Sequence, residues 1–590
     1  MRSWQEAGRF DWTDHPLADT ILVAAHAWRG DPDLLDCPSR QGVRVRRITI
    51  LVITIPLLTF MSCGGSTTTG GGGAPIDNPP VAPAALQKVY TEHLGSLIGT
   101  VQYSSESVGL IGTDLGSSFE RDGKLVFLFG DGWTTNPAYW DGDPAAWVDP
   151  AANPLVTGEV PELHWFLEST GQFLPLRVPG VDMGPFNVPL EGVPVGSDTY
   201  LFVATGLLIN APQLVLARAD GLAFDALSVE SKTPAGKFLN VSVVEDGGFL
   251  WIFGSGTYRQ SAVYLARVEP SRISDRNAWS YFRGYEQGAP VFGLSESSAT
   301  PVVSAACVGE LSVRRHEGLG YLMSYNCDNP RGIHLRFAEQ PAGPWSAPIV
   351  IFQPGADHGY GFFMHQKESE VNYDDGLSGP GRTDEWGGEY GPYMIPQWTT
   401  SDTPGVFSIV YTLSSWNPYK AHLMRSIVAK PGVAASLPPE RGTNLPPATL
   451  VNGDFAAGDL SGWQTSGDAF AVIPGTGGQW WLTTNVPLEG GTAVQGEAWQ
   501  DFSIDAKTHE LRFTVSGGDA ASVKLQLLRG GVVIDNVRAS WGRRSDTTET
   551  PVHWLLDDLH GETVRLLIED HSADDWGYVT TTGFTFVQDP

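Results

Sequence analysis

The feature that most constrains the fold is a strand pattern that recurs between residues 86 and 432. Short apolar runs rich in aromatic residues occur five times, and a second apolar run follows four of them. The first set, which we expect to form the second strand of each unit, is 124–132, 199–206, 249–256, 320–327 and 406–414. The second set, which we expect to form the third strand, is 214–219, 263–268, 333–338 and 422–428. In the first unit the segment 164–170 is the candidate for the second run. Units of roughly 50 to 80 residues have room for four strands, so the period predicts a five-bladed β-propeller rather than one large sandwich. Part of the segment before Gly109 is expected to help close the ring.

The composition agrees with an all-β chain and limits its partners. The 590 residues include 69 Gly, 42 Pro, 20 Trp and 17 Tyr, which are turn formers and strand-favouring aromatics. The formal net charge of −29 excludes nucleic acids and anionic membrane surfaces, since both need a basic face. Neutral sugars fit better, because aromatic rings offer stacking faces and carboxylates accept hydroxyl hydrogen bonds.

The N-terminal region predicts the compartment. Three arginines between 44 and 47, an apolar run over 48–60 and the small residues around Cys63 follow the order of a secretory signal. The segment 43–63 resembles a bacterial lipoprotein signal, which implies a lipid anchor at Cys63 and a place at the cell envelope or extracellular surface. Residues 1–42 precede this signal and are interpreted as a mis-assigned extension, with the true start near Val43. Residues 64–85 are rich in Gly, Ser, Thr and Pro and predict a disordered tether.

A second domain follows a Pro-rich linker at 433–449. Residues 450–590 contain alternating strand patterns typical of an antiparallel β-sandwich. Their opening "NGDF" and closing "DDWGY" segments resemble the jelly-roll modules attached to secreted carbohydrases. A sugar-binding module and a purely structural sandwich both stay open. Trp480, Trp481 and Trp499 suit stacking on sugar rings, although tryptophans in sandwiches more often belong to the core.

Two aspartates stand out in the first repeat. The segment 109–133 predicts a hairpin whose turn is Asp122-Gly123, so paired residue numbers sum to 245 and Asp114 lies opposite Asp131. Like charges at cross-strand positions destabilise a sheet, whereas glycosidic bond cleavage needs two carboxyl groups at about 5 Å or more. Direct opposition favours a retaining mechanism. The alternative is that one or both aspartates lie beyond the strands in a loop, since eight residues per arm is long for a strand.

The repeat supplies an internal control for this pair. Aligning the turns of the first and third units places Asp131 at the position of Ser255, and the second unit has Thr205 there. Blade geometry therefore does not require a carboxylate at residue 131. A local functional reason for Asp131 becomes the better explanation.

Several separated motifs carry a family resemblance. "GTDLGSSF", "GKLVFLFGDGW", "VEDGGFLWIFGSGTYRQ", "GELSV" and "YGPYMIPQWT" resemble the five-bladed propeller family catalogued as a domain of unknown function, some of whose members are endo-D-arabinanases. The resemblance implies a hydrolase that cuts D-arabinan without a cofactor, and it places the catalytic pair at Asp114 and Asp131. The rival hypothesis is a non-catalytic lipoprotein whose propeller binds glycans. We expect a monomer in either case.

Other residues are candidates by their place in the repeat. The expected substrate contacts are Asn240, Tyr258, Arg259, Glu310, His358, Tyr390 and Asn417. Glu310 opens the fourth unit, where it suits an acid or a hydroxyl ligand, although a solvated blade edge is the alternative. Cys307 and Cys327 flank a hairpin and are either a disulfide in an oxidising compartment or two free thiols. No metal-binding motif occurs, and we expect no metal.

Overall fold

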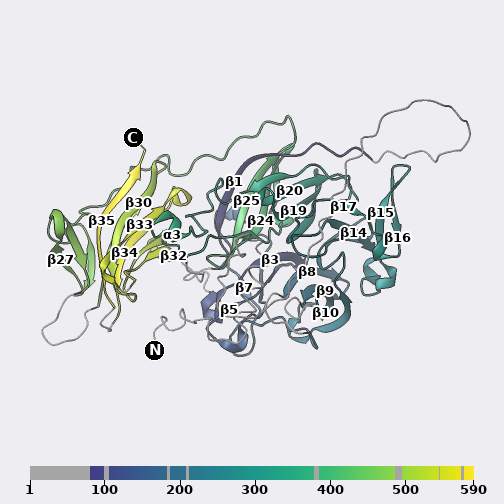
Figure 1. Ribbon diagram of the computed structural model, residues 1–590, viewed down its shortest axis with the longest axis horizontal. Helices are drawn as coiled ribbons and strands as arrows, with labels where there is room; N and C mark the ends of the chain where they lie inside the picture. Colours follow the sequence, from purple (N-terminus) through teal and green to yellow (C-terminus); the bar gives the residue numbers. More distant parts are fainter. Residues whose placement is uncertain are drawn as a thin grey trace, which may run out of the picture. The chain divides into compact units, whose positions relative to one another are not determined.

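A computed structural model describes residues 80–98, 105–181, 187–206, 211–377, 384–485, 495–543, 545–572 and 577–589 (Figure 1). The predicted signal, Cys63 and residues 64–79 of the predicted tether lie outside the described residues. None of the helices within the described ranges has the length and apolar character that a membrane crossing requires.

The larger part of the described chain is a five-bladed β-propeller. Each blade is an antiparallel sheet, and the inner strands contact one another in the ring order β3, β8, β12 and β18, while β24 of the last blade contacts β3. The first two blades are β3 (Leu115–Arg121), β4 (Lys124–Phe129), β6 (Ala145–Val148) and β7 (His164–Trp165), then β8 (Val188–Val195), β9 (Asp198–Thr205), β10 (Gln213–Asp220) and β11 (Ser228–Pro234). The third is β12 (Asn240–Asp246), β13 (Phe249–Ser255), β14 (Val263–Val268), β15 (Ser280–Glu286) and β16 (Ala289–Gly293), with β17 (Pro301–Val303) beside β14. The fourth is β18 (Leu311–His316), β19 (Gly320–Asp328), β20 (Arg331–Ala338) and β21 (Ile349–Phe352).

The N-terminal strand closes the ring. The fifth blade contains β22 (Glu389–Tyr390), β23 (Thr400–Thr403), β24 (Val406–Ser415) and β25 (Lys420–Ala429), and its outermost strand is β1 (Gln87–Ser96). β1 pairs antiparallel with β25, from Gln87 opposite Ala429 to Ser96 opposite His422, and the two lie side by side in Figure 1 although far apart in sequence. The prediction that the segment before Gly109 helps to close the ring is confirmed.

The apolar runs of the second strands are explained by burial on both faces. Leu128 packs with Leu201 of the second blade, whereas its neighbours Phe127 and Phe129 pack with Leu423 of the fifth. The same division gives one core cluster between each pair of adjacent blades. Strands covered on both faces read as continuous apolar segments instead of alternating ones.

One strand of the first blade was predicted wrongly. The third strand is β6, which pairs with β4 through Leu125 opposite Val148. Only His164 and Trp165 of the predicted segment 164–170 form a strand, and that strand is the fourth. β6 contributes a run of four residues after a Gly- and Pro-containing turn, so its sequence signal is weaker than that of the aromatic segment that follows it.

A buried ion pair crosses the centre of the propeller. Arg314 on β18 donates to both carboxylate oxygens of Glu191 on β8, at 2.7 and 3.0 Å, and it also donates to Ser242 of β12 and to the carbonyl of Ser118 on β3. Its side chain and that of Glu191 are 7% and 4% exposed. One guanidinium therefore joins the inner strands of four blades.

The C-terminal domain is a β-sandwich of two five-stranded sheets. One sheet contains β26 (Gln464–Gly467), β29 (Gly496–Ser503), β34 (Thr563–Asp570), β31 (Ser522–Arg529) and β32 (Val532–Ser540), and the other contains β27 (Ala471–Pro474), β28 (Trp480–Thr483), β35 (Val579–Gln588), β30 (Thr508–Gly517) and β33 (Ser545–Leu555). Trp480 packs against the core of this domain, Trp481 is buried, and the half-buried Trp499 is covered by Arg565. These contacts favour a structural role for the three tryptophans.

A loop of the propeller adds backbone hydrogen bonds to the sandwich. The Asp374 N–H donates to the carbonyl of Pro551, the His553 N–H donates to the carbonyl of Asp374, and the Ala539 N–H donates to the carbonyl of Gly376. Arg543 forms an ion pair with Asp374 at 3.2 Å. The described residues from 80 onward accordingly belong to one compact unit.

Candidate active site

The register of the first hairpin differs from the predicted register next to Asp114. The pairs Arg121 with Lys124 and Ser117 with Leu128 keep the sum of 245, but a bulge between Leu115 and Ser117 shifts Leu115 opposite Phe129. Asp114 therefore pairs with Gly130, whose N–H donates to its carbonyl at 3.0 Å, and not with Asp131. The prediction of direct opposition is wrong, and the argument for retention that depended on it no longer holds.

Both aspartates lie just beyond the strands, at the mouth of the hairpin. β3 begins at Leu115 and β4 ends at Phe129. The carboxyl of Asp114 lies over Gly130, where an added Cβ would come within 2.2 Å of Oδ1. Glycine at residue 130 thus makes room for the acid.

A different aspartate accompanies Asp131. Gly132 forms a β-bridge with Gly142, so Asp131 and Asp143 flank the same bridge. Asp143 is fully buried, and neither of its carboxyl oxygens has a hydrogen-bond partner among the described residues. Burial first, and then the charges of Asp131, Asp114 and Asp141, raise the pKa of Asp143 well above its ordinary value. Asp131 therefore lies opposite Asp143, across the bridge between Gly132 and Gly142, and not opposite Asp114 as the sequence predicts.

Asp114 has the environment of a proton-transferring group. Burial raises its pKa to about 7, and the charge of Glu310 acts in the same direction, while hydrogen bonds from Tyr390 and Tyr419 oppose the shift. The Tyr390 hydroxyl donates to Oδ2 at 2.7 Å. An acid whose pKa lies near neutrality can both give and take a proton at physiological pH. Burial is the main cause of the raised pKa of Asp114.

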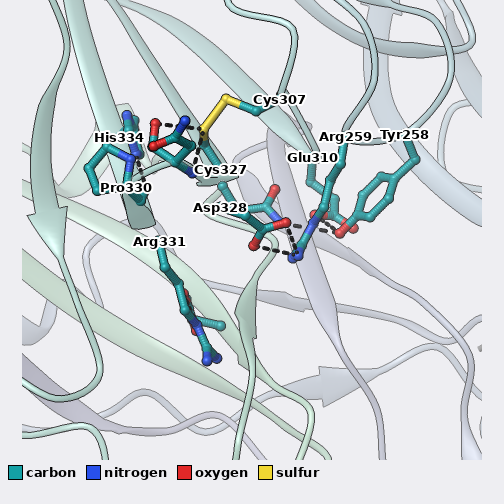
Figure 2. A network of polar contacts seen from close by, with 12 residues as sticks. Tyr258, Arg259, Cys307, Glu310, Cys327, Asp328, Pro330, Arg331 and His334 are labelled. Carbon is teal, nitrogen blue, oxygen red and sulfur yellow. Dashed lines mark hydrogen bonds and ion pairs between the residues drawn. A yellow bond between two sulfur atoms is a disulfide. The ribbon is translucent and has the colours of Figure 1, made fainter. Parts of the chain in front are cut away.

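A second part of the site surrounds Glu310, which immediately precedes β18 and is 7% exposed. The Tyr258 hydroxyl donates to its Oε2 at 3.0 Å, and Asn326 donates to the same hydroxyl at 3.1 Å. Arg259 reaches both carboxylate oxygens of Asp328 at 2.9 Å (Figure 2). Burial raises the pKa of Glu310, whereas the charge of Arg259 lowers it.

Figure 2 shows that a disulfide borders this network. Cys307 and Cys327 are bonded, with their Cα atoms 5.1 Å apart, and Cys327 directly precedes Asp328. The Gly309 N–H donates to the carbonyl of Asn326, and the Arg259 N–H donates to the carbonyl of Val308. The disulfide and these bonds fix the segment that carries Glu310.

Residues 390 and 391 connect the two parts. Tyr390 donates to Asp114, and the N–H of the next residue, Gly391, donates to Glu310. Tyr393, which is buried, lies within electrostatic reach of both acids. The structure thus brings together six of the nine predicted catalytic and substrate-binding residues: Asp114, Asp131, Tyr258, Arg259, Glu310 and Tyr390.

The other three predicted contacts are engaged in different ways. Asn240 opens β12, and its side chain donates to the carbonyl of Gly256 at 3.4 Å. The exposed His358 stacks on Phe362, next to Asp357, which pairs with Lys88 of the outermost strand. Asn417 is buried and donates to the carbonyl of Glu385. His358 and Asn417 therefore have structural contacts that account for them.

Sequence reasoning missed Asp141, Asp143, Tyr393 and Tyr419. The available signal was the run Asp141-Gly142-Asp143, in which two acids are separated by one glycine. Within the described residues, the His, Asp and Glu groups close enough to hold a metal are His509, Asp557 and His560, and Glu497, Glu569 and His571, both in the sandwich. No such group occurs among the described acids of the propeller site.

Comparisons with known proteins give a family match and distant structural likenesses. A family model described as a domain of unknown function (DUF4185) matches residues 216–425, a range that includes Glu310 but neither Asp114 nor Asp131. A search of curated proteins returns no match.

The solved structures to which this chain is similar have low sequence identity to it. An exo-β-1,3-galactanase from Phanerochaete chrysosporium is 10% identical, covers 79% of this chain and 95% of its own, and has a TM-score of 0.35. A glycoside hydrolase family 43 arabinoxylan arabinofuranohydrolase from Bacillus subtilis is 11% identical. The match covers 83% of the present chain and 99% of the hydrolase, with a TM-score of 0.29. At these values the likeness carries no argument about activity.

Proposed function

We propose that this protein is a glycoside hydrolase that cuts a furanose-rich polysaccharide, with D-arabinan cut internally as the first substrate to test. The observation that carries the proposal is the buried Asp114, whose pKa is raised to about 7 beside Asp131, Asp143 and Glu310. Fold stability alone gives no reason to bury these acids together, because each must lose hydration or take up a proton. Glycosidic cleavage uses such a set, in which one carboxyl protonates the leaving oxygen and another is ionised.

The roles follow from the environments. Asp114 is the proposed general acid, since it holds a proton near neutral pH and is oriented by two tyrosine hydroxyls. Asp131 is the proposed second carboxylate, which either attacks the sugar directly or activates a water molecule. Glu310, Tyr258 and Arg259 are proposed to position the sugar hydroxyls.

The test is a screen of furanose and pyranose polymers with the purified protein, followed by the Asp114→Asn and Asp131→Asn variants. We expect oligosaccharides from arabinan with the wild type, and binding without release with both variants. Binding without release by the wild type would instead establish the rival function, a propeller that holds glycans for other enzymes.

The envelope location is a separate proposal. It depends on the signal-like segment 43–63, with lipid attachment at Cys63. Mass spectrometry of the mature N-terminus tests it: a lipid-modified peptide beginning at Cys63 is expected, and a mature peptide that starts before Cys63 would rule it out.

A further inference from the structure

A stack of three aromatic rings leads from the buried acid to the surface. Trp133, two residues after Asp131, stacks on Tyr419 with ring centroids 4.9 Å apart and planes 22° apart. Trp133 also stacks on Trp140, with ring centroids 5.8 Å apart and planes 23° apart. Tyr419 is buried and hydrogen-bonded to Asp114, whereas Trp140 is 39% exposed.

The fold does not need an indole at residue 140. Trp140 belongs to none of the core clusters among the described residues, although its neighbour Tyr139 packs on one. The 39% exposed indole of Trp140 leaves part of an apolar, amphipathic ring face accessible to a ligand.

The loop that presents Trp140 is held in place by its backbone. Asn136 caps the short helix η4 (Pro137–Tyr139) by accepting the Ala138 N–H. The Asp141 N–H donates to the carbonyl of Gly132 at 3.0 Å, and the Gly142 N–H donates to the carbonyl of Tyr139. Because these bonds order the loop in advance, a ligand that stacks on Trp140 does not have to bear the entropy cost of ordering it.

We propose that Trp140 is a stacking subsite for one sugar ring of the substrate chain, at a ring other than those joined by the cleaved bond. The inference rests on the proposed function, and it adds the place where the polymer continues beyond the carboxyl groups. A sugar ring has an apolar C–H face that suits an indole, and its hydroxyls suit the adjacent carboxyl of Asp141. The chain's net charge of −29 favours a neutral polymer over an anionic one.

The experiment compares Trp140→Ala with the matched control Trp541→Ala, because Trp541 lies in the sandwich and is similarly exposed at 43%. Binding of D-arabinan oligosaccharides of increasing length is measured in the Asp114→Asn background, where cleavage does not interfere. We expect Trp140→Ala to weaken the binding of long oligosaccharides about three- to tenfold and to leave the shortest ones unchanged, while Trp140→Tyr keeps most of the affinity and Trp541→Ala changes nothing.

Kinetics with the unmodified Asp114 separate a subsite from a structural role. Loss of a remote subsite raises KM for the polymer and leaves kcat for the shortest cleaved substrate unchanged. An equal loss of kcat on short and long substrates, or no loss of affinity for long ones, would overturn the inference. Binding that depends on Trp140 without any cleavage would contradict only the proposed hydrolase function, and cleavage that is indifferent to Trp140 would contradict only the subsite.

Discussion

The buried carboxyl of Asp114 lowers the stability of the folded protein as the pH rises. Its pKa is raised from 3.8 to about 7, so the folded state binds the proton more tightly than the unfolded chain does. A group of this kind contributes its full stability below the unfolded pKa and loses it as the pH rises through the folded pKa. Between about pH 4 and pH 7 the folded protein should lose about 4 kcal/mol at this one carboxyl.

The Asp114→Asn variant, which does not titrate at this position, should therefore be more stable than the wild type above about pH 7 by up to about 4 kcal/mol, and should show no such gain near pH 4. Denaturant unfolding across this pH range measures the difference, with Asp225→Asn, an exposed acid, as the control. An Asn variant that is less stable than the wild type at every pH would contradict the assignment of a buried, proton-binding carboxyl.

At the scale of elements, the bulge in β3 sets the position of the acid. Gly116 has φ of +100°, and a Cβ there would lie 3.1 Å from Cγ2 of Thr412. Gly116→Ala should cost about 1–3 kcal/mol and lower kcat by moving Asp114. Gly123→Ala is the control, since Gly123 also has a positive φ but no atom within 4 Å of its Cβ position. It should cost stability without loss of kcat, and an equal kcat for both variants would argue against the bulge as the positioning element.

The buried ion pair between Arg314 and Glu191 leads to a second prediction about how the blades are held together. Removal of one partner leaves a buried charge uncompensated, so Arg314→Met should destabilise the propeller by about 3–5 kcal/mol. The adjacent Arg315, whose side chain is 53% exposed, contacts Asp246 at 3.5 Å. Arg315→Met should cost less than about 1 kcal/mol. Similar unfolding midpoints for the two variants in urea would show that the central pair does not join the blades as described.

The same strands show which parts of the fold could be predicted from the sequence. The second strands and four of the third strands were predictable because both faces of each strand are buried, which leaves long apolar runs. β6 was not predicted, because a strand of four residues is too short to show a clear hydrophobic pattern. The register of Asp114 could not be predicted, because a glycine inside a predicted strand either continues the regular ladder or marks a bulge, and the bulge at Gly116 becomes evident only in the structure. The pairing of Arg314 with Glu191 could not be predicted, since it depends on closure of the whole ring.

For the whole molecule, closure by β1 predicts where the chain can be shortened. A chain that starts at residue 80 keeps every strand of the fifth blade, whereas one that starts at residue 97 loses β1 and exposes the edge of β25. An open sheet edge favours aggregation. The first chain should melt like the full protein, and the second should be poorly soluble or melt well below it in circular dichroism. Equal melting temperatures would mean that β1 is dispensable for the ring.

The central claim is that the buried acids at the mouth of the first hairpin break a glycosidic bond. The most direct measurement is the initial rate at which reducing ends are released from D-arabinan by the wild type, by Asp114→Asn and by the exposed control Asp225→Asn, with folding of each checked. The account predicts release by the wild type and the control, and a loss of about a hundredfold or more with Asp114→Asn. Equal release by Asp114→Asn and the wild type would contradict it.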